Sequence, residues 1–208
     1  IAPNDFIPIA EQNGVIQKLQ NTVLRDICIL INELNSKKLI DDSFKVSINI
    51  SQVQFNSTTL KTELLNVVND YGVNPSNIKL EITESMLSGD IASVISQIDE
   101  LKQQGFIFSI DDFGTGYSCL THLSSFSVNE LKVDKSFIDK ILDKGTGFSI
   151  VQTIINLGKS LSLTVVAEGV ETEEQFTILK TMNVDMIQGY LIAKPMHFED
   201  YLHWHQSF

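Results

Sequence analysis

The sequence predicts an α/β fold, a (β/α)8 barrel of the TIM type, and three observations support this. Short runs rich in β-branched and aromatic residues alternate with longer amphipathic segments, and no low-complexity linker interrupts them. Polar or charged residues recur where the short runs end, as expected for a barrel whose reactive groups collect where strands lead into helices. The length of 208 residues suits one domain, so we expect a single domain over residues 1–208.

Six segments are strand candidates, because each is a short apolar run of β-rich composition. They are Val46–Ile50, Ile78–Ile82, Phe106–Ile110, Glu130–Val133, Leu163–Ala167 and Asp185–Ile187. A closed barrel needs eight strands. The opening residues 1–8 read as the tail of a loop before a helix, so we expect the sequence to be truncated at its N-terminus and to lack the first strands of the domain.

Helix candidates lie between these strands. Apolar residues at helical spacing predict a long opening helix over residues 15–34 and another over residues 91–101, which Asp90 would cap at its N-terminus. Thr172 and Gln175 fit the Ser/Thr-x-x-Glu/Gln capping box and predict a further helix that begins just beyond Glu171.

Composition and charge limit the kinds of molecule that this protein is expected to bind. The formal net charge of -11 argues against binding of a nucleic-acid polymer, which needs basic patches to displace counterions. An anionic substrate remains compatible, because bound divalent cations invert the local field of an acidic pocket. No apolar run is long enough to span a membrane, there is no signal pattern, and the two cysteines resemble reduced thiols. We therefore expect a cytoplasmic domain without membrane contact.

The most informative stretch is an apolar run that ends in the adjacent carboxylates of Asp111 and Asp112, followed by a loop with two glycines. A carboxylate near the interior needs a counter-charge, which a divalent cation could supply. The other strand ends add a consistent set of side chains: Asn49, Glu81, Lys132, Glu168 and Gln188. Carboxylate and amide oxygens without sulfur or imidazole favour Mg²⁺ or Mn²⁺ over zinc.

Structural interpretations of the same residues stay open at this point. The acidic residues could form an internal ion-pair network, although few basic residues adjoin the strand ends to neutralise them. Lys132 could be a counter-charge alone, and Gln188 could satisfy backbone groups. Asp134 and Glu84 could be helix-start charges or ion-pair partners. A protein-kinase interpretation of Asp112-Phe113-Gly114 fails, because the other kinase motifs do not occur in this sequence.

An ordered set of motifs across nearly the whole chain resembles the EAL family of cyclic-di-GMP phosphodiesterases. The set is Phe6-Ile7-Pro8-Ile9-Ala10-Glu11, Asn49-Ile50-Ser51, Glu81-Ile82-Thr83-Glu84-Ser85, Asp111-Asp112-Phe113-Gly114-Thr115-Gly116-Tyr117-Ser118, Lys132-Val133-Asp134, Ala167-Glu168-Gly169-Val170-Glu171-Thr172 and Gln188-Gly189-Tyr190. The Glu-Ala-Leu signature does not occur in the sequence, and the resemblance places it on an early strand before Phe6. We therefore expect one ligand glutamate to be missing, and the activity of this fragment depends on it.

The resemblance implies a site with two divalent ions, Mg²⁺ or Mn²⁺. Asn49, Glu81 and Asp111 would hold one ion, while Asp111, Asp112 and Glu168 would hold the second, with Asp111 as the bridge. Two cations roughly 3.5–4 Å apart can activate water and stabilise both the attacking and the leaving oxygens in phosphodiester cleavage.

The remaining implied roles concern the catalytic water, the substrate and a loop. Lys132 would orient or activate the water together with Glu168, and Glu171 would position it. Gln188 would contact the substrate, with Asp134 in support. Glu84 would anchor the loop after the acidic pair, whose residues include Gly114, Thr115 and Gly116.

The resemblance thus implies metal-dependent hydrolysis of cyclic-di-GMP to the linear dinucleotide pGpG, which lowers the level of a bacterial second messenger. The alternative is a catalytically inactive EAL-type receptor for cyclic-di-GMP or a protein-interaction domain. The family commonly carries additional sensory or GGDEF (diguanylate cyclase) domains, and homodimerisation is plausible by resemblance.

Overall fold

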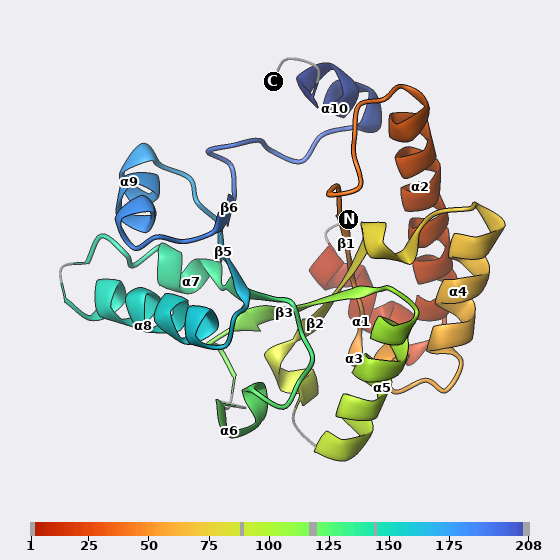
Figure 1. Ribbon diagram of the computed structural model, residues 1–208, viewed down its shortest axis with the longest axis horizontal. Helices are drawn as coiled ribbons and strands as arrows, with labels where there is room; N and C mark the ends of the chain where they lie inside the picture. Colours follow the sequence, from red (N-terminus) through yellow and green to blue (C-terminus); the bar gives the residue numbers. More distant parts are fainter. Residues whose placement is uncertain (1–2, 88–89, 117–119, 144, 206–208) are drawn as a thin grey trace. The chain divides into compact units, whose positions relative to one another are not determined.

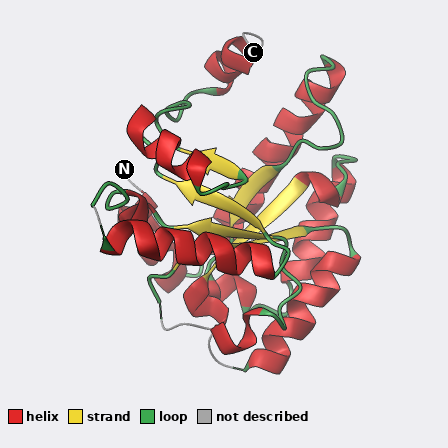
Figure 2. Cartoon of the chain, turned by 60° about the vertical axis from the view of Figure 1, so that its left-hand side comes forward, coloured by secondary structure: helices red, strands yellow, loops and turns green. Residues whose placement is uncertain are grey.

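The computed structural model describes residues 3–87, 90–116, 120–143 and 145–205 (Figure 1). The chain divides into two compact units, described separately below. Unit 1 comprises Ile1–Leu80, Glu100–Ile107 and Phe198–Phe208, and unit 2 comprises Glu81–Asp99 and Phe108–His197. Figure 2 shows strands in yellow and helices in red, and the two alternate along most of the chain.

Unit 1 is dominated by helices. Its elements are α1 (Pro3–Gln12), α2 (Ile16–Ser36), β1 (Val46–Asn49), α3 (Gln52–Phe55), α4 (Leu60–Asp70), the 3-10 turn η1 (Pro75–Asn77) and α10 (Phe198–His205). The helix α2 buries Leu24, Cys28, Ile31 and Leu34 at helical spacing, and it packs against α4. The predicted opening helix is therefore confirmed.

Unit 2 contains β4 (Glu130–Val133), β5 (Thr164–Glu168) and β6 (Met186–Gln188), and most of β3 (Ile107–Phe113). Its helices are α6 (Leu120–Leu123), α7 (Lys135–Ile138), α8 (Thr146–Ser160) and α9 (Glu173–Thr181), with the 3-10 turn η2 (Glu84–Leu87). Residues of β2 (Ile78–Thr83) and α5 (Ile91–Gln103) belong to both units. All four residues of β4 are buried, and α8 packs against β4 and β5.

The strands form one sheet in the order β1-β2-β3-β4-β5-β6. The pairs β3–β4, β4–β5 and β5–β6 are parallel, with Lys132 opposite Val166 and Glu168 opposite Gln188. Parallel strands that follow their order along the chain, joined through helices, are the arrangement of a TIM-type barrel. All six predicted strands are present, each within a few residues of its predicted bounds.

The helix predictions after residue 90 are also confirmed. The backbone amide of Ser93 donates to a side-chain oxygen of Asp90 at 3.4 Å, next to the start of α5. The capping box that opens α9 is complete, because Thr172 and Gln175 each accept a backbone amide from the other. Among the described residues, no helix combines the length and the apolar character that crossing a membrane requires.

The prediction for the opening segment was wrong. Residues 3–12 form the helix α1 rather than the tail of a loop. Pro3 is compatible with a first helical turn, whose amides have no partner inside the helix, whereas Pro8 gives up one helical hydrogen bond. Ala10 is buried, and α1 packs against α2, so tertiary packing outweighs the cost of Pro8.

Candidate metal centre

The acidic pair lies at an irregularity near the end of β3. The pairing of β3 with β4 shifts register between Ile110 and Phe113, so Asp111 and Asp112 occupy a bulge. Asp112 has a φ of 53°, a left-handed conformation that Asp adopts more readily than most residues. Its backbone amide donates to Oδ1 of Asp111 at 3.0 Å. The bulge thus brings two consecutive carboxylates to the end of one strand.

Lys132, in the middle of the buried strand β4, joins the acids of three strands. Its Nζ lies 2.9 Å from Glu81 Oε2, 3.1 Å from Asp111 Oδ1 and 2.6 Å from Glu168 Oε1. The lysine side chain is 4% exposed, and those of Asp111 and Glu168 are 14% and 16% exposed. One buried cation therefore faces three carboxylates, and Asp112 adds a fourth within reach of Asp111 and Glu168.

Burial and the neighbouring carboxylates shift the pKa values of these groups. Burial raises the pKa of Glu168 to about 7, the charges of Asp111 and Glu81 add to this, and Lys132 opposes it. Burial and the charge of Asp111 also raise the pKa of Asp112. Burial alone would lower the pKa of Lys132, but the carboxylates around it outweigh burial and raise that pKa above its ordinary value.

These residues fit a divalent cation. Oxygens of Asp111, Asp112 and Glu168 lie within 4.8 Å of one another, which is close enough for one ion to contact all three. The donors are hard carboxylate oxygens, which suit Mg²⁺, Mn²⁺ or Ca²⁺. One lysine faces three carboxylates with a fourth beside them, so the carboxylates outnumber their counter-charge and a further cation would be favourable there.

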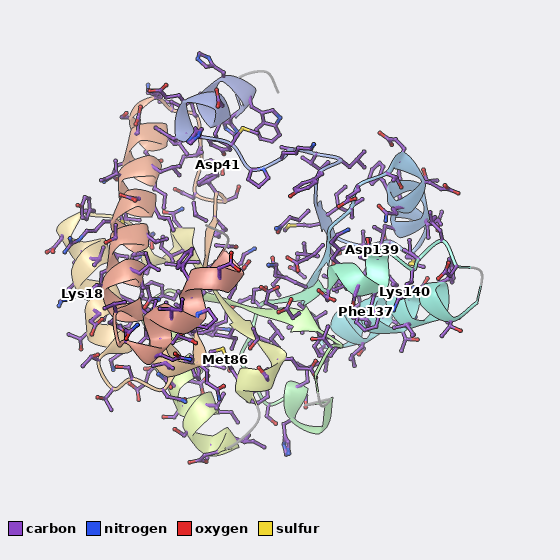
Figure 3. The ribbon with its side chains drawn as sticks, turned by 180° about the vertical axis from the view of Figure 1, so that it is seen from behind. Lys18, Asp41, Met86, Phe137, Asp139 and Lys140 are labelled. Carbon is purple, nitrogen blue, oxygen red and sulfur yellow. The ribbon has the colours of Figure 1, made fainter. Side chains whose placement is uncertain are left out.

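Glu84 holds the loop after β3. Its carboxylate is buried, and its Oε2 accepts the backbone amides of Gly114 at 2.9 Å and Gly116 at 3.3 Å. Thr115 donates its hydroxyl to the carbonyl of Asp112 at 2.8 Å. Gly114 has a φ of 98°, and a Cβ there would lie 2.8 Å from the ring of Phe137, which Figure 3 labels, so a larger residue does not fit. Tyr117 and Ser118 of the motif lie outside the described residues.

Three further sequence candidates lie in unit 2. Asp134 caps the start of α7, where its Oδ1 accepts the backbone amide of Ser136 at 3.0 Å. Glu171 is exposed and pairs with Lys135 at 3.0 Å. Gln188 ends β6 opposite Glu168, and its side chain is exposed.

Asn49 is the last residue of β1 and is exposed. It belongs to unit 1, whereas Glu81, Asp111, Asp112, Lys132 and Glu168 all belong to unit 2. The assignment of Asn49 as a metal ligand therefore stays a prediction.

The sequence did not single out Lys135, the partner of Glu171. One signal was available, because Lys135 follows Lys132 by three residues and Glu171 follows Glu168 by three. Val133 is opposite Ala167 in the parallel register of β4 and β5, so the segments that follow the two strands leave the sheet next to each other, with Lys135 two residues beyond Val133 and Glu171 four beyond Ala167. Using that signal requires knowing that these two strands are neighbours.

The fold and the acidic strand ends define an α/β domain of the TIM-barrel type with a candidate divalent-metal centre where its strands end. The EAL domain family model matches residues 1–195, and the chain belongs to this family.

Curated relatives and solved structures support the assignment to the EAL family. The chain is 36% identical over 207 residues to the oxygen sensor protein DosP of Escherichia coli, covering 100% of this chain and 26% of DosP. It is 36% identical over 197 residues to the cyclic di-GMP phosphodiesterase NbdA of Pseudomonas aeruginosa, covering 94% of this chain and 25% of NbdA. The structure of the PaMucR phosphodiesterase in complex with c-di-GMP matches with a TM-score of 0.91 at 34% identity, covering 97% of this chain and 81% of that one. The predicted family and TIM-like fold are thus confirmed, and the chain spans about a quarter of the length of DosP and NbdA.

Proposed function

We propose that this protein hydrolyses cyclic-di-GMP to linear pGpG and that residues 1–208 act as its EAL domain. The observation that carries the proposal is the cluster of buried Glu81 and half-buried Asp111 and Glu168 around the buried Lys132, with the exposed Asp112 beside it, in a chain of the EAL family. NbdA is named a cyclic di-GMP phosphodiesterase, and the PaMucR structure is a complex with c-di-GMP.

We assign two ions, Mg²⁺ or Mn²⁺, to this centre. Asn49, Glu81 and Asp111 would hold one ion, and Asp111, Asp112 and Glu168 would hold the other. When bound, such a pair of ions lowers the pKa of a water and neutralises charge on the phosphate. The mutual distance of at most 4.8 Å among the oxygens of the second set supports this division.

The chain's own residues hold the charges of the reaction. Lys132 keeps its ammonium protonated beside the carboxylates, so it can donate hydrogen bonds to the attacking water or to a phosphoryl oxygen as negative charge develops there. Glu168 presents a carboxylate with a raised pKa that can accept the water's proton. Glu171, which lies in the loop after Glu168, orients that water.

The substrate is held by residues that flank the cluster. Gln188 of β6 lies opposite Glu168 of β5, and its side-chain amide donates hydrogen bonds to the nucleotide or accepts them from it. Asp134 fixes the start of α7, and Glu84 fixes Gly114, Thr115 and Gly116 beside the acidic pair. Each of these contacts limits the motion of a strand-end loop around the substrate.

The remaining assignments concern the protein in the cell. We infer a cytoplasmic domain, because the family implies that the substrate is cyclic-di-GMP, a messenger inside the bacterial cell. The relatives are several times longer than this chain, which supports the presence of sensory or GGDEF domains beside it. We also propose that the protein forms a homodimer, as the family resemblance implies.

The test is a turnover assay on the protein as it occurs naturally and on the 208-residue chain. Cyclic-di-GMP is incubated with Mg²⁺, Mn²⁺, Ca²⁺ or EDTA, and the products are separated by chromatography. We expect pGpG with Mg²⁺ or Mn²⁺, none with EDTA, and binding without comparable turnover with Ca²⁺, whose larger and more flexible coordination sphere suits this geometry less well. Tight binding without turnover in every metal would contradict hydrolysis and assign the domain as a receptor.

A further inference from the structure

Lys135 links the loops that follow two neighbouring strands. It is the first residue of α7, directly after Asp134 at the end of β4. Its Nζ lies 2.6 Å from Oδ1 of Asp139, the residue that caps the end of α7. The same Nζ lies 3.0 Å from Oε1 of Glu171, in the loop after β5. The second contact ties α7 to the segment that carries Glu168 and Glu171.

The stem of Lys135 makes a second contact with the same loop. A Cβ at Gly169 would lie 2.3 Å from Cγ and 2.6 Å from Cδ of Lys135, so the methylene groups lie directly against the Gly169 backbone. Gly169 has a φ of 67°, a conformation that favours glycine. Lys135 therefore touches the residue after Glu168 with its stem and Glu171 with its charge.

These two contacts act at the site more than on the stability of the fold. The Lys135 and Glu171 side chains are 45% and 44% exposed, and ion pairs that exposed contribute little to stability. Catalysis is more sensitive, because a displacement of about 1 Å of a positioning group can cost about 100-fold in rate. A lysine in this place can affect turnover strongly without affecting folding.

We propose that Lys135 is a positioning residue that holds the Glu168–Glu171 loop and orients the Glu171 carboxylate toward the reacting water. The inference rests on the proposed hydrolysis of cyclic-di-GMP and deepens it. Among the described residues, the charge of Lys135 pairs with Asp139 and Glu171 rather than with a proposed metal ligand, and Lys135 acts through Glu171.

The test combines two variants of Lys135 with a matched control. Lys135→Met keeps most of the stem and removes the charge, and Lys135→Arg restores a charge that can reach Glu171. Lys37→Met is the control, because Lys37 forms an exposed pair with Glu33 at 2.7 Å, with side chains 43% and 37% exposed. We expect Lys135→Met to lower kcat about tenfold, with KM and the metal requirement changed less than about twofold, Lys135→Arg to recover most of the loss, and Lys37→Met to behave as wild type.

Glu171→Gln supplies the decisive comparison. If Lys135 acts through Glu171, Lys135→Met lowers kcat no further in the Glu171→Gln background. An equal loss in both backgrounds, full activity of Lys135→Met, or no recovery with Lys135→Arg would overturn the proposal.

Amide hydrogen exchange separates this inference from the proposed function. The Glu171 amide donates to Gln175 Oε1 at 2.8 Å, and its exchange reports the order of the loop without any turnover. We expect faster exchange at Val170, whose amide donates to the Gln188 carbonyl, and at Glu171 in Lys135→Met than in Lys37→Met. If wild type does not hydrolyse cyclic-di-GMP, the hydrolysis proposal fails, and unchanged exchange would then overturn the role of Lys135 as well.

Discussion

The buried polar cluster of unit 1 and that of unit 2 differ in charge balance. In unit 1, Gln54 accepts the Ser51 amide at 2.9 Å and donates to Gln20 Oε1 at 2.7 Å and to the Ile16 carbonyl at 3.3 Å. All of these groups are neutral. Within the described chain, Nε2 of Gln20 is the only buried side-chain nitrogen or oxygen without a hydrogen-bond partner. In unit 2, one buried lysine faces three carboxylates and a fourth lies beside them.

The difference shows what each cluster is suited to do. The neutral network fixes the start of α3 and its packing on α2, and it holds no charge that a cation would compensate. A buried network with excess charge is costly to fold, and the cost falls when a cation binds. The first cluster should therefore respond to mutation in the same way with and without metal, and the second should not.

The largest expected effect is that of Asp111→Asn on catalysis. The amide is nearly isosteric, but it removes the charge at the ligand that both ions would share, so we expect kcat to fall by about 100-fold or more with a small change in stability. Turnover of cyclic-di-GMP and urea unfolding measure the two quantities. Near-normal turnover at saturating Mg²⁺ would rule out Asp111 as a shared ligand.

Lys132→Met tests the charge balance directly. Without metal it leaves the buried Glu81 and the half-buried Asp111 and Glu168 without their counter-charge, and breaking a buried network costs about 3–5 kcal/mol of unfolding free energy. Mg²⁺ should recover much of that stability, while kcat stays about 10²–10³-fold below wild type because the positioned donor is lost.

Lys61→Met is the control for that variant. Lys61 pairs with Glu100 at 2.7 Å, but the two side chains are 42% and 54% exposed, so we expect a loss below about 1 kcal/mol. If Lys132→Met retained normal turnover once Mg²⁺ had restored its fold, Lys132 would be a counter-charge alone.

The pH dependence of stability sharpens the contrast further. The pKa of Glu168 is raised by burial to about 7 in the folded protein, so between about pH 4.5 and 7 the folded state binds more protons than the unfolded state. The contribution of Glu168 to stability therefore falls as the pH rises through this window, by at most about 3 kcal/mol, and is flat above it.

Urea unfolding of wild type and Glu168→Gln in EDTA isolates this contribution. We expect the stability of wild type relative to Glu168→Gln to fall between pH 5 and 7, and we expect Mg²⁺ to reduce the fall. A difference that stayed constant with pH would show that the Glu168 carboxyl is not perturbed in the fold.

The features that could be predicted from the sequence depend on local rules. The six strands follow from short β-rich runs, and the start of α9 follows from the Thr172 capping box. The acidic strand ends could be grouped because parallel strands end at one edge of a sheet.

The features that could not be predicted depend on tertiary packing. The bulge at Asp111 and Asp112 comes from the pairing of β3 with β4, and the three partners of Lys132 come from the order of the strands. Residues 1–8 are predicted as the tail of a loop, whereas residues 3–12 form the helix α1, which its packing on α2 stabilises despite Pro8.

The smallest effect expected for a buried cluster is that of Gln54→Met. The change leaves the Ser51 amide and Gln20 Oε1 without their partners in a buried place, which costs about 1–3 kcal/mol of unfolding free energy. The methionine side chain has a similar length, so the change removes no charge and little volume. The loss of unfolding free energy should therefore be the same in EDTA and in Mg²⁺. Urea unfolding in both conditions measures it beside Lys132→Met, whose loss Mg²⁺ reduces. If Mg²⁺ reduced both losses equally, the two clusters would not differ in the way their charges indicate, because metal would then stabilise the fold without regard to the charge balance at Lys132.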